Sequence, residues 1–267
     1  MPKTSFFDEL PVLFDELHLE RLSDDKKALL EQIDALLPQT QCGLCGYRDG
    51  CLPYAHAIVT KQEAIHLCVP GGDETARAIA TLTHRPILPA TPSKWAIDPQ
   101  KNRPIAMRAI IDEDSCIGCT KCIPACPVDA IIGTAKHMHS VIESLCTGCE
   151  LCLPPCPVDC ISLVPNTNDL SDTEAFRQRY HAHLNRSAKR LSGGDGAPVV
   201  SHSQSKLASM VAGDTTTINQ QTAQQTIAQA KLRSQIKKLT KQLATRPDSA
   251  KQAELDHLIQ TLHSLTQ

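Results

Sequence analysis

The sequence has few aromatic residues and no long apolar segment. Phe, Trp and Tyr together make up 3% of the 267 residues, so aromatic rings cannot supply most of a core. No run of 18 apolar residues occurs, which excludes a predicted membrane-spanning helix. The first residues are acidic and interrupted by Pro11, unlike a signal peptide. We therefore expect a cytoplasmic protein without direct membrane insertion.

Sequence patterns for nucleotide binding and for nucleophilic catalysis are also missing. There is no P-loop and no G-x-G-x-x-G fingerprint, and no nucleophile is paired with a recognisable base. The basic residues of the C-terminal region alternate with glutamine and leucine and have no aromatic neighbours, which disfavours nucleic-acid binding. We expect neither catalytic activity of the chain's own nor a nucleic-acid partner.

Cysteine, in contrast, is abundant. A disulfide framework is disfavoured for thirteen cysteines in a chain without an export signal, because the cytosol keeps thiols reduced. Metal binding is the better explanation of their number.

Eight of the cysteines lie in an internal repeat with a period of thirty, within residues 107–166. "DSCIGCTKCIPACPVDAII" is followed by "SLCTGCELCLPPCPVDCIS", and each copy predicts a strand, a cysteine loop, a helical turn and a strand. The spacing C-x2-C-x2-C-x3-C-P is that of bacterial ferredoxins with two 4Fe–4S clusters, in which the fourth cysteine binds the other cluster. Zinc is the disfavoured alternative, because zinc knuckles have no use for a third cysteine two residues further on. The predicted ligands are Cys116, Cys119, Cys122 and Cys156 for cluster I, and Cys146, Cys149, Cys152 and Cys126 for cluster II.

Four further cysteines predict an N-terminal site. Cys42, Cys45, Cys51 and Cys68 have the spacing C-x2-C-x5-C-x16-C. A helix over 53–66 is expected to span the gap and deliver the fourth ligand. A third 4Fe–4S cluster is the favoured content, and a zinc knuckle or a site without Cys51 is the alternative.

These motifs together resemble the B-subunit family of the Rnf electron transport complex. The matching stretches are "LLPQTQCGLCGY", "GC" with "PYA", and Cys68 followed by "PGG", before a two-cluster ferredoxin segment. The resemblance implies a relay of single electrons through three 4Fe–4S clusters. It also implies redox partners, namely flavoprotein or iron–sulfur subunits of an Rnf-like membrane complex that holds the chain at the inner face of the plasma membrane. The chain departs from the family pattern by one extra residue before Cys51, by lacking a membrane helix and by a long C-terminal extension.

The predicted fold class is α+β, with five regions. These are an acidic, amphipathic segment (1–22), a helical 4Fe–4S domain (23–84), a Pro-rich linker (85–106), a ferredoxin domain (107–166) and a helical, partly disordered extension (167–267). Helices are expected at 23–37, at 73–82 with Asp73 as its cap, and at 172–191. Disorder is expected at 192–205, and a helical hairpin is expected from 218–245 and 250–266.

Smaller features carry expectations of their own. Cys160 is expected to pack as a small buried residue beside a cluster, and His137 and His139 to share a solvated strand face. The apolar residues of the acidic N-terminal segment either staple it to the core or form a docking peptide; they are Phe6, Phe7, Leu10, Leu13, Phe14 and Leu17.

The charge distribution suggests contact between the two ends of the chain. Residues 1–36 contain nine acidic and four basic residues, a net charge of −5, and residues 169–267 contain eight acidic and thirteen basic residues, a net charge of +5. We expect the basic C-terminal region to bind the acidic segment within the chain.

Two other classes of function remain open. The chain could be the electron-feeding subunit of a redox enzyme, or a redox-sensing or structural iron–sulfur protein.

We predict about twelve iron atoms per chain after anaerobic purification, because twelve cysteines form three groups of four. Iron and zinc analysis of the purified protein measures this number. About eight iron atoms with about one zinc would show that the N-terminal site is not a cluster.

Overall fold

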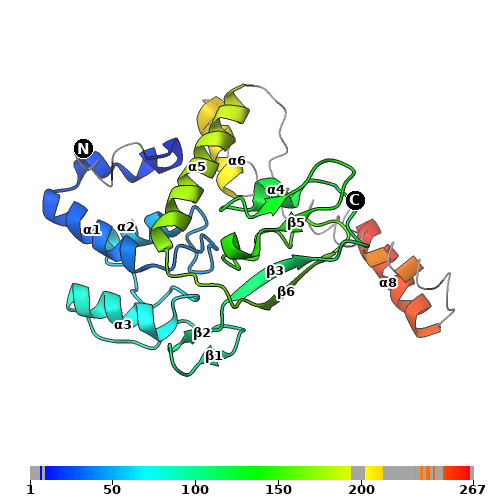
Figure 1. The fold of residues 1–267 in the computed structure, drawn as a ribbon, viewed down its shortest axis with the longest axis horizontal. Helices are drawn as coiled ribbons and strands as arrows, with labels where there is room; N and C mark the ends of the chain where they lie inside the picture. The colour runs from blue at the N-terminus through cyan, green and yellow to red at the C-terminus, as the bar shows by residue number, and fades with distance from the viewer. Residues whose placement is uncertain are drawn as a thin grey trace.

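The chain has a helical N-terminal half and a ferredoxin-like half built from short strands (Figure 1). A computed structural model describes residue 7, residues 10–193, 202–212 and 249–264, and six positions between 232 and 243. Mixed helices and small two-stranded sheets agree with the expected α+β class. Most of the helix expected at 218–245, and the turn after it, lie outside the described residues.

Short helices form the N-terminal half. They are η1 (Val12–Leu17), η2 (Leu19–Arg21), α1 (Asp24–Leu36), α2 (Cys51–Lys61) and α3 (Gly72–Thr83). The expected helices at 23–37 and 73–82 are confirmed to within a residue or two. Asp73 is not the cap of α3, however, since it lies inside the first turn and accepts a hydrogen bond from the Ala90 amide.

The helix expected at 53–66 is confirmed at its start to within two residues, but its expected end is wrong. It begins at Cys51 and ends at Lys61, where Gln62 adopts a left-handed conformation that stops the helix. Residues 62–71 then form a loop. Cys68 is therefore carried by this loop and not by the end of a helix.

The ferredoxin-like half contains two antiparallel ribbons. The strand β3 (Met107–Ile111) pairs with β6 (Ile161–Pro165), and β4 (Ile131–Ile132) pairs with β5 (Ser140–Val141). The first copy of the repeat has a helical turn, α4 (Cys122–Ala125), whereas the second has turns at 151–155 and the short η3 (Glu143–Leu145) before its cysteines. Each copy thus contributes one strand to each ribbon, but the turns around the cysteines differ between the copies.

The Pro-rich linker is fixed against the helical half. It contains a small hairpin of β1 (Ile97–Asp98) and β2 (Arg103–Pro104), which packs on α3. The Thr91 amide donates to the His66 carbonyl over 2.9 Å. Backbone contacts of this kind set the position of the linker beside the loop that carries Cys68.

Three C-terminal helices are described: α5 (Thr173–Ser192), α6 (His202–Ala212) and α8 (Ser249–Ser264). The expected helix at 172–191 is confirmed, with the Asp172 side chain as N-cap for the Ala175 amide. The expected disorder at 192–205 is wrong for residues 202–205, which begin α6. No helix among the described residues is long and apolar enough to cross a bilayer.

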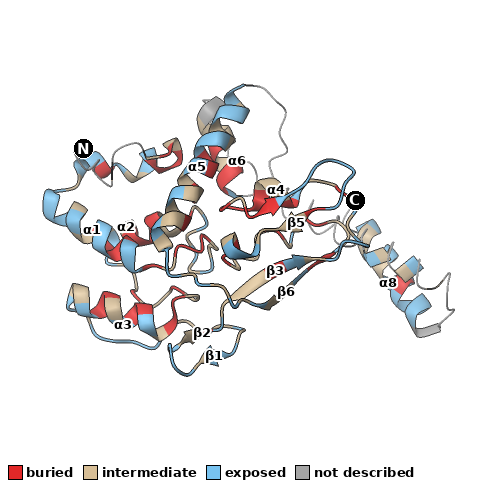
Figure 2. Cartoon of the chain, in the orientation of Figure 1, coloured by how far each residue is buried: buried red, intermediate tan, exposed pale blue. Residues whose placement is uncertain are grey.

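A single core joins the N-terminal segment to α5 and α6 (Figure 2). Leu13 and Phe14 are buried in this core with Tyr180, Leu184 and Leu207. They therefore staple the segment in place and cannot anchor the chain on a partner, as the docking alternative required. Phe6 lies outside the described residues.

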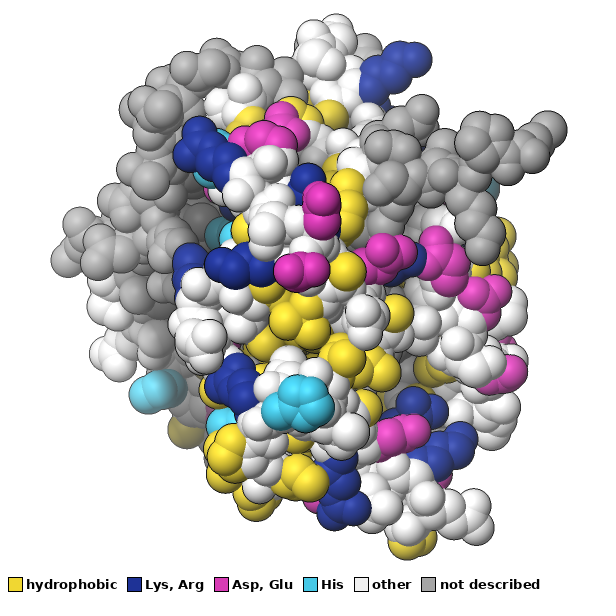
Figure 3. All heavy atoms as spheres, turned by 90° about the vertical axis from the view of Figure 1, so that its left-hand side faces the viewer, with side chains coloured by type: hydrophobic (Ala, Val, Ile, Leu, Met, Phe, Trp, Pro, Cys, Tyr) yellow, Lys and Arg dark blue, Asp and Glu magenta, His cyan; other side chains and the backbone are white. Residues whose placement is uncertain are grey.

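Charged groups add to this contact, as the charge distribution predicted. Lys206 Nζ on α6 lies 2.8 Å from Glu16 Oε2. Deeper in the core, Arg177 Nη1 lies 2.7 Å from Asp34 Oδ2, and Asp34 is fully buried. Burial raises the pKa of Asp34, and the guanidinium of Arg177 opposes that rise. On the side of the molecule where α1–α3 lie, apolar side chains are interspersed with basic and acidic ones (Figure 3).

Candidate iron–sulfur cluster sites

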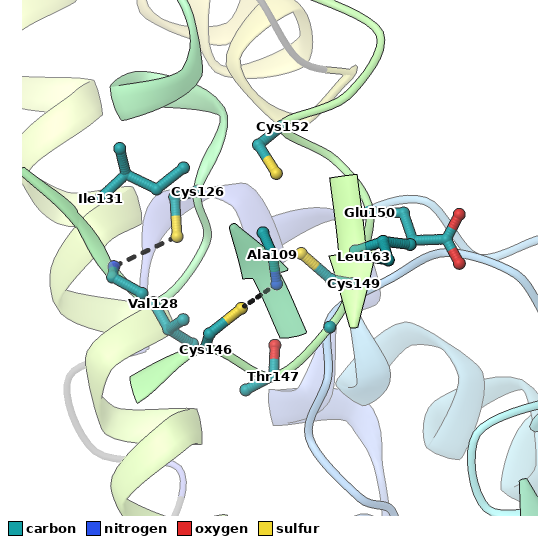
Figure 4. A pocket seen from close by; sticks show the side chains of 12 residues that line it. Ala109, Cys126, Val128, Ile131, Cys146, Thr147, Cys149, Glu150, Cys152 and Leu163 are labelled. Atoms are coloured by element: carbon teal, nitrogen blue, oxygen red, sulfur yellow. Dashed lines mark hydrogen bonds between the residues drawn. The ribbon is translucent and has the colours of Figure 1, made fainter. Parts of the chain in front are cut away.

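One cavity lies between the two copies of the repeat, against β3. Cys146, Cys149 and Cys152 line it from the second cysteine loop, and Cys126 lines it from the end of the first. Figure 4 shows the four sulfur atoms pointing toward the same space. The remaining lining is mostly apolar and includes Ala109 and Leu163. Four thiols around one small apolar space are the ligand set that a 4Fe–4S cluster requires.

A second cavity is related to the first by the repeat. Cys116, Cys119 and Cys122 line it from the first loop, and Cys156 from the end of the second. The two cavities are similar in size. In each, three cysteines thus come from one copy and the fourth from the other copy.

Backbone amides point at several of these sulfur atoms. The Ala109 amide lies 3.3 Å from Cys146 Sγ, and the His139 amide lies 3.4 Å from Cys116 Sγ. The Ala130 amide donates to Cys126 Sγ over 3.2 Å. Such bonds stabilise the negative charge of a thiolate that is removed from water.

The N-terminal cysteines come together around the start of α2. Cys51 interacts electrostatically with Cys68 and Cys42, and Cys68 with Cys42 and Cys45. The loop carrying Cys68 is held by Tyr54, whose hydroxyl donates to the Ala64 carbonyl over 2.8 Å and accepts from the Leu67 amide over 3.1 Å. The four residues expected to form this site are thus neighbours.

The thiols are strongly desolvated. Burial, followed by the negative charge of neighbouring cysteines, raises the pKa of Cys122 and of Cys152 to about 12. Burial also raises the pKa of Cys51 and of Cys149 well above the usual value for a thiol. Thiols of this kind become thiolates when cationic metal neutralises them, so the residues fit an iron–sulfur group. Among the described residues, no three His, Cys, Asp or Glu side chains converge as they would around a single metal ion.

Comparisons with known proteins agree with these sites. Residues 109–163 match a family model described as "4Fe-4S dicluster domain", and residues 37–70 match one described as "Putative Fe-S cluster". The chain is 56% identical over 137 residues to the B subunit of the ion-translocating oxidoreductase complex of Klebsiella pneumoniae, covering 51% of this chain and 68% of the relative. With the protein of the same name from Cronobacter sakazakii it is 52% identical over 145 residues, covering 54% of this chain and 72% of the relative.

The chain belongs to the B-subunit family of the ion-translocating oxidoreductase complex. This is the Rnf family that the motifs resembled, and the protein is an iron–sulfur electron-transfer protein. No solved structure matches the chain.

The residues directly before Cys51 lie in a turn that the C-terminal helices hold. The Tyr180 hydroxyl on α5 donates to the Asp49 carbonyl over 2.9 Å, and Lys206 Nζ on α6 lies 2.9 Å from Asp49 Oδ2. Gly50 has a φ of 110°, and a Cβ there would lie 2.5 Å from Gln41 Oε1 and 2.7 Å from Tyr180 Cε1. A turn at Asp49 and Gly50 is therefore present, and only glycine fits its second position.

Sequence reasoning missed several polar residues of these sites. Gln41 Oε1 accepts from the Cys51 amide over 2.8 Å and so caps α2. His139 was expected on a solvated face with His137, but only His137 is exposed and His139 is buried against Cys122. Neither the capping by Gln41 nor the burial of His139 could be predicted from residue spacing in a single sequence. Cys160 is buried beside Cys156 and lines the same cavity, which confirms its expected small packing role.

We predict that Tyr180→Phe makes the N-terminal site more labile. The substitution leaves the Asp49 carbonyl without its side-chain donor, and the loss of one such bond weakens a loop by about 1 kcal/mol. About four of the twelve iron atoms should then be released to a chelator roughly fivefold faster than in the unchanged protein.

The matched control is Ser209→Ala. Among the described residues, this hydroxyl bonds along α6, to the Lys206 carbonyl, so its removal should leave iron release unchanged. Equal acceleration at all three sites would contradict a local role for Tyr180.

Proposed function

We propose that the protein relays single electrons through three 4Fe–4S clusters. Each cluster would supply a site that accepts and returns one electron at a time. The proposed ligands are Cys42, Cys45, Cys51 and Cys68 for the N-terminal cluster, Cys116, Cys119, Cys122 and Cys156 for cluster I, and Cys146, Cys149, Cys152 and Cys126 for cluster II.

The observation that carries this proposal is the composition of the two ferredoxin cavities. Each is lined by three cysteines of one loop and by the fourth cysteine of the other copy. Two-cluster ferredoxins exchange their fourth ligand in the same manner. The twofold arrangement brings two one-electron sites into one small domain, as transfer between them requires.

We also propose an order of the sites along the molecule. The second cysteine loop contacts the helical half, where Thr147 Oγ1 donates to the Thr40 carbonyl over 3.3 Å. It also contacts the linker, where Trp95 Nε1 donates to Glu150 Oε1 over 3.1 Å. In the first loop, Ile117 is 55% exposed. Cluster II would thus lie between the N-terminal site and cluster I.

The proposed partners are redox subunits of a membrane complex. The relatives are named as subunits of an ion-translocating oxidoreductase complex, and we infer that this chain serves a similar assembly. Flavoprotein or iron–sulfur subunits would give and take its electrons. The chain would reach the membrane by contact with these partners.

A reductive titration tests the proposed function. The anaerobically purified protein should take up about three electrons per chain reversibly, one for each cluster. The measurement is visible absorbance and electron paramagnetic resonance (EPR) against added reductant, followed by reoxidation. Irreversible bleaching on reduction would contradict a carrier and favour a structural or sensing role.

The exchange of ligands has its own test. Cys126→Ser should alter the EPR signal of the cluster held by Cys146, Cys149 and Cys152, because Cys126 would be its fourth ligand. Cys160→Ser is the control, since Cys160 lies beside a cluster cavity without being a proposed ligand. Damage confined to the cluster of the Cys116 loop would rule out the exchange.

A further inference from the structure

His139 is a buried histidine at the edge of the first-loop cavity. Its side chain is 1% exposed, whereas His137, two residues earlier in the same connection, is exposed. Its Nδ1 atom lies 3.3 Å from Cys122 Sγ and 3.9 Å from Cys116 Sγ. The imidazole therefore lines the cavity beside two of its four cysteines.

The internal repeat shows that this side chain is an addition to a shared framework. With a period of thirty, His139 is equivalent to Ala109. Both residues direct their backbone amides at the first cysteine of the other copy, Cys116 and Cys146. The backbone contact is thus common to both cavities, and the imidazole is present at one of them.

Space for the imidazole is provided by a second difference between the copies. Ala109 pairs with Leu163 across β3 and β6, and both residues line the second-loop cavity. The residue equivalent to Leu163 is Gly133, where an added Cβ would lie 2.2 Å from His139 Cδ2. At the second-loop cavity, small Ala109 thus lies beside large Leu163. At the first-loop cavity, large His139 lies beside Gly133, which leaves room for the imidazole.

The placement of His139 has a cost that packing alone does not explain. Its Nε2 is buried and has no hydrogen-bond partner among the described residues. Burying an unsatisfied polar atom is unfavourable, and an apolar residue at this position would avoid that cost. A hydrogen bond from the imidazole to a sulfur atom of the cavity would offset the cost of the unsatisfied Nε2.

We propose that His139 donates a hydrogen bond from Nδ1–H to the Cys122 thiolate and thereby raises the reduction potential of cluster I above that of cluster II. This inference rests on the proposed function, because it requires a cluster held by Cys116, Cys119, Cys122 and Cys156. A hydrogen bond to a ligand sulfur stabilises the more negative, reduced state. His139 is a positioning residue in this account, since it places a hydrogen-bond donor beside the Cys122 sulfur. An electron shared by the two ferredoxin clusters would then reside mainly on cluster I.

The test compares His139→Ala with His139→Asn. Alanine reproduces the residue of the other copy, whereas the Asn side-chain amide can offer a donor near the place of Nδ1. His137→Ala is the matched control on the exposed side of the same connection. Iron content is measured first, and the potentials of the clusters are then determined by titration monitored by EPR.

We expect His139→Ala to retain its iron and to lower the reduction equilibrium constant of one cluster about tenfold, which is about 59 mV for one electron. The affected signal should be the one that Cys119→Ser alters. His139→Asn should recover most of the loss, and His137→Ala should match the unchanged protein. Unchanged potentials in an iron-replete His139→Ala, or equal shifts for alanine and asparagine, would overturn the hydrogen bond.

A second measurement keeps the inference testable if His139→Ala loses iron. In the unchanged protein labelled with ¹⁵N-histidine, pulsed EPR should detect a weak nitrogen coupling at the first-loop cluster, as a hydrogen bond predicts. A strong coupling, indicating direct ligation, or none at all would overturn the proposal. An unchanged protein without iron at this site would instead refute the proposed function on which the inference rests.

Discussion

The constraint on which the rest of the structure depends is the gathering of thiols in spaces that exclude water. Burial, followed by the negative charge of neighbouring cysteines, raises the pKa of Cys122 and of Cys152, so these cavities favour a cationic metal partner. Because each ferredoxin cavity takes its fourth cysteine from the other copy, the two copies cannot separate without opening both sites. Clusters bound in these cavities would cross-link the two copies and so help a chain with few aromatic residues to hold short strands together.

Two of the few aromatic residues support the N-terminal site. Tyr54 holds the loop that carries Cys68, and Tyr180 holds the turn that precedes Cys51. Tyr180 belongs to α5, which shares its core with Leu13 and Phe14 of the N-terminal segment. The C-terminal helices and the first residues therefore support the same site, although they are distant in sequence.

The two ferredoxin cavities share a framework but differ in their surroundings. The second loop contacts the helical half through Thr147 and the linker through Glu150, whereas the first-loop cavity is lined by His139 and by exposed Ile117. A symmetric pair of sites would give an electron no preferred position between them. The pairs Ala109–Leu163 and His139–Gly133 break that symmetry without altering the backbone bonds to sulfur.

The sequence by itself determined the groups of cysteines, the repeat and the positions of α1, α3 and α5, because ligand spacing and helical periodicity are local properties. It did not determine where α2 ends, since the conformation of Gln62 and the contacts of Tyr54 come from folding. Nor could it place Phe14 in the core or His139 beside Cys122, because an acidic segment and a polar turn give no sign of what covers them. Only the tertiary structure decided those positions, since burial depends on residues more than a hundred positions away for Phe14 and on the opposing glycine for His139.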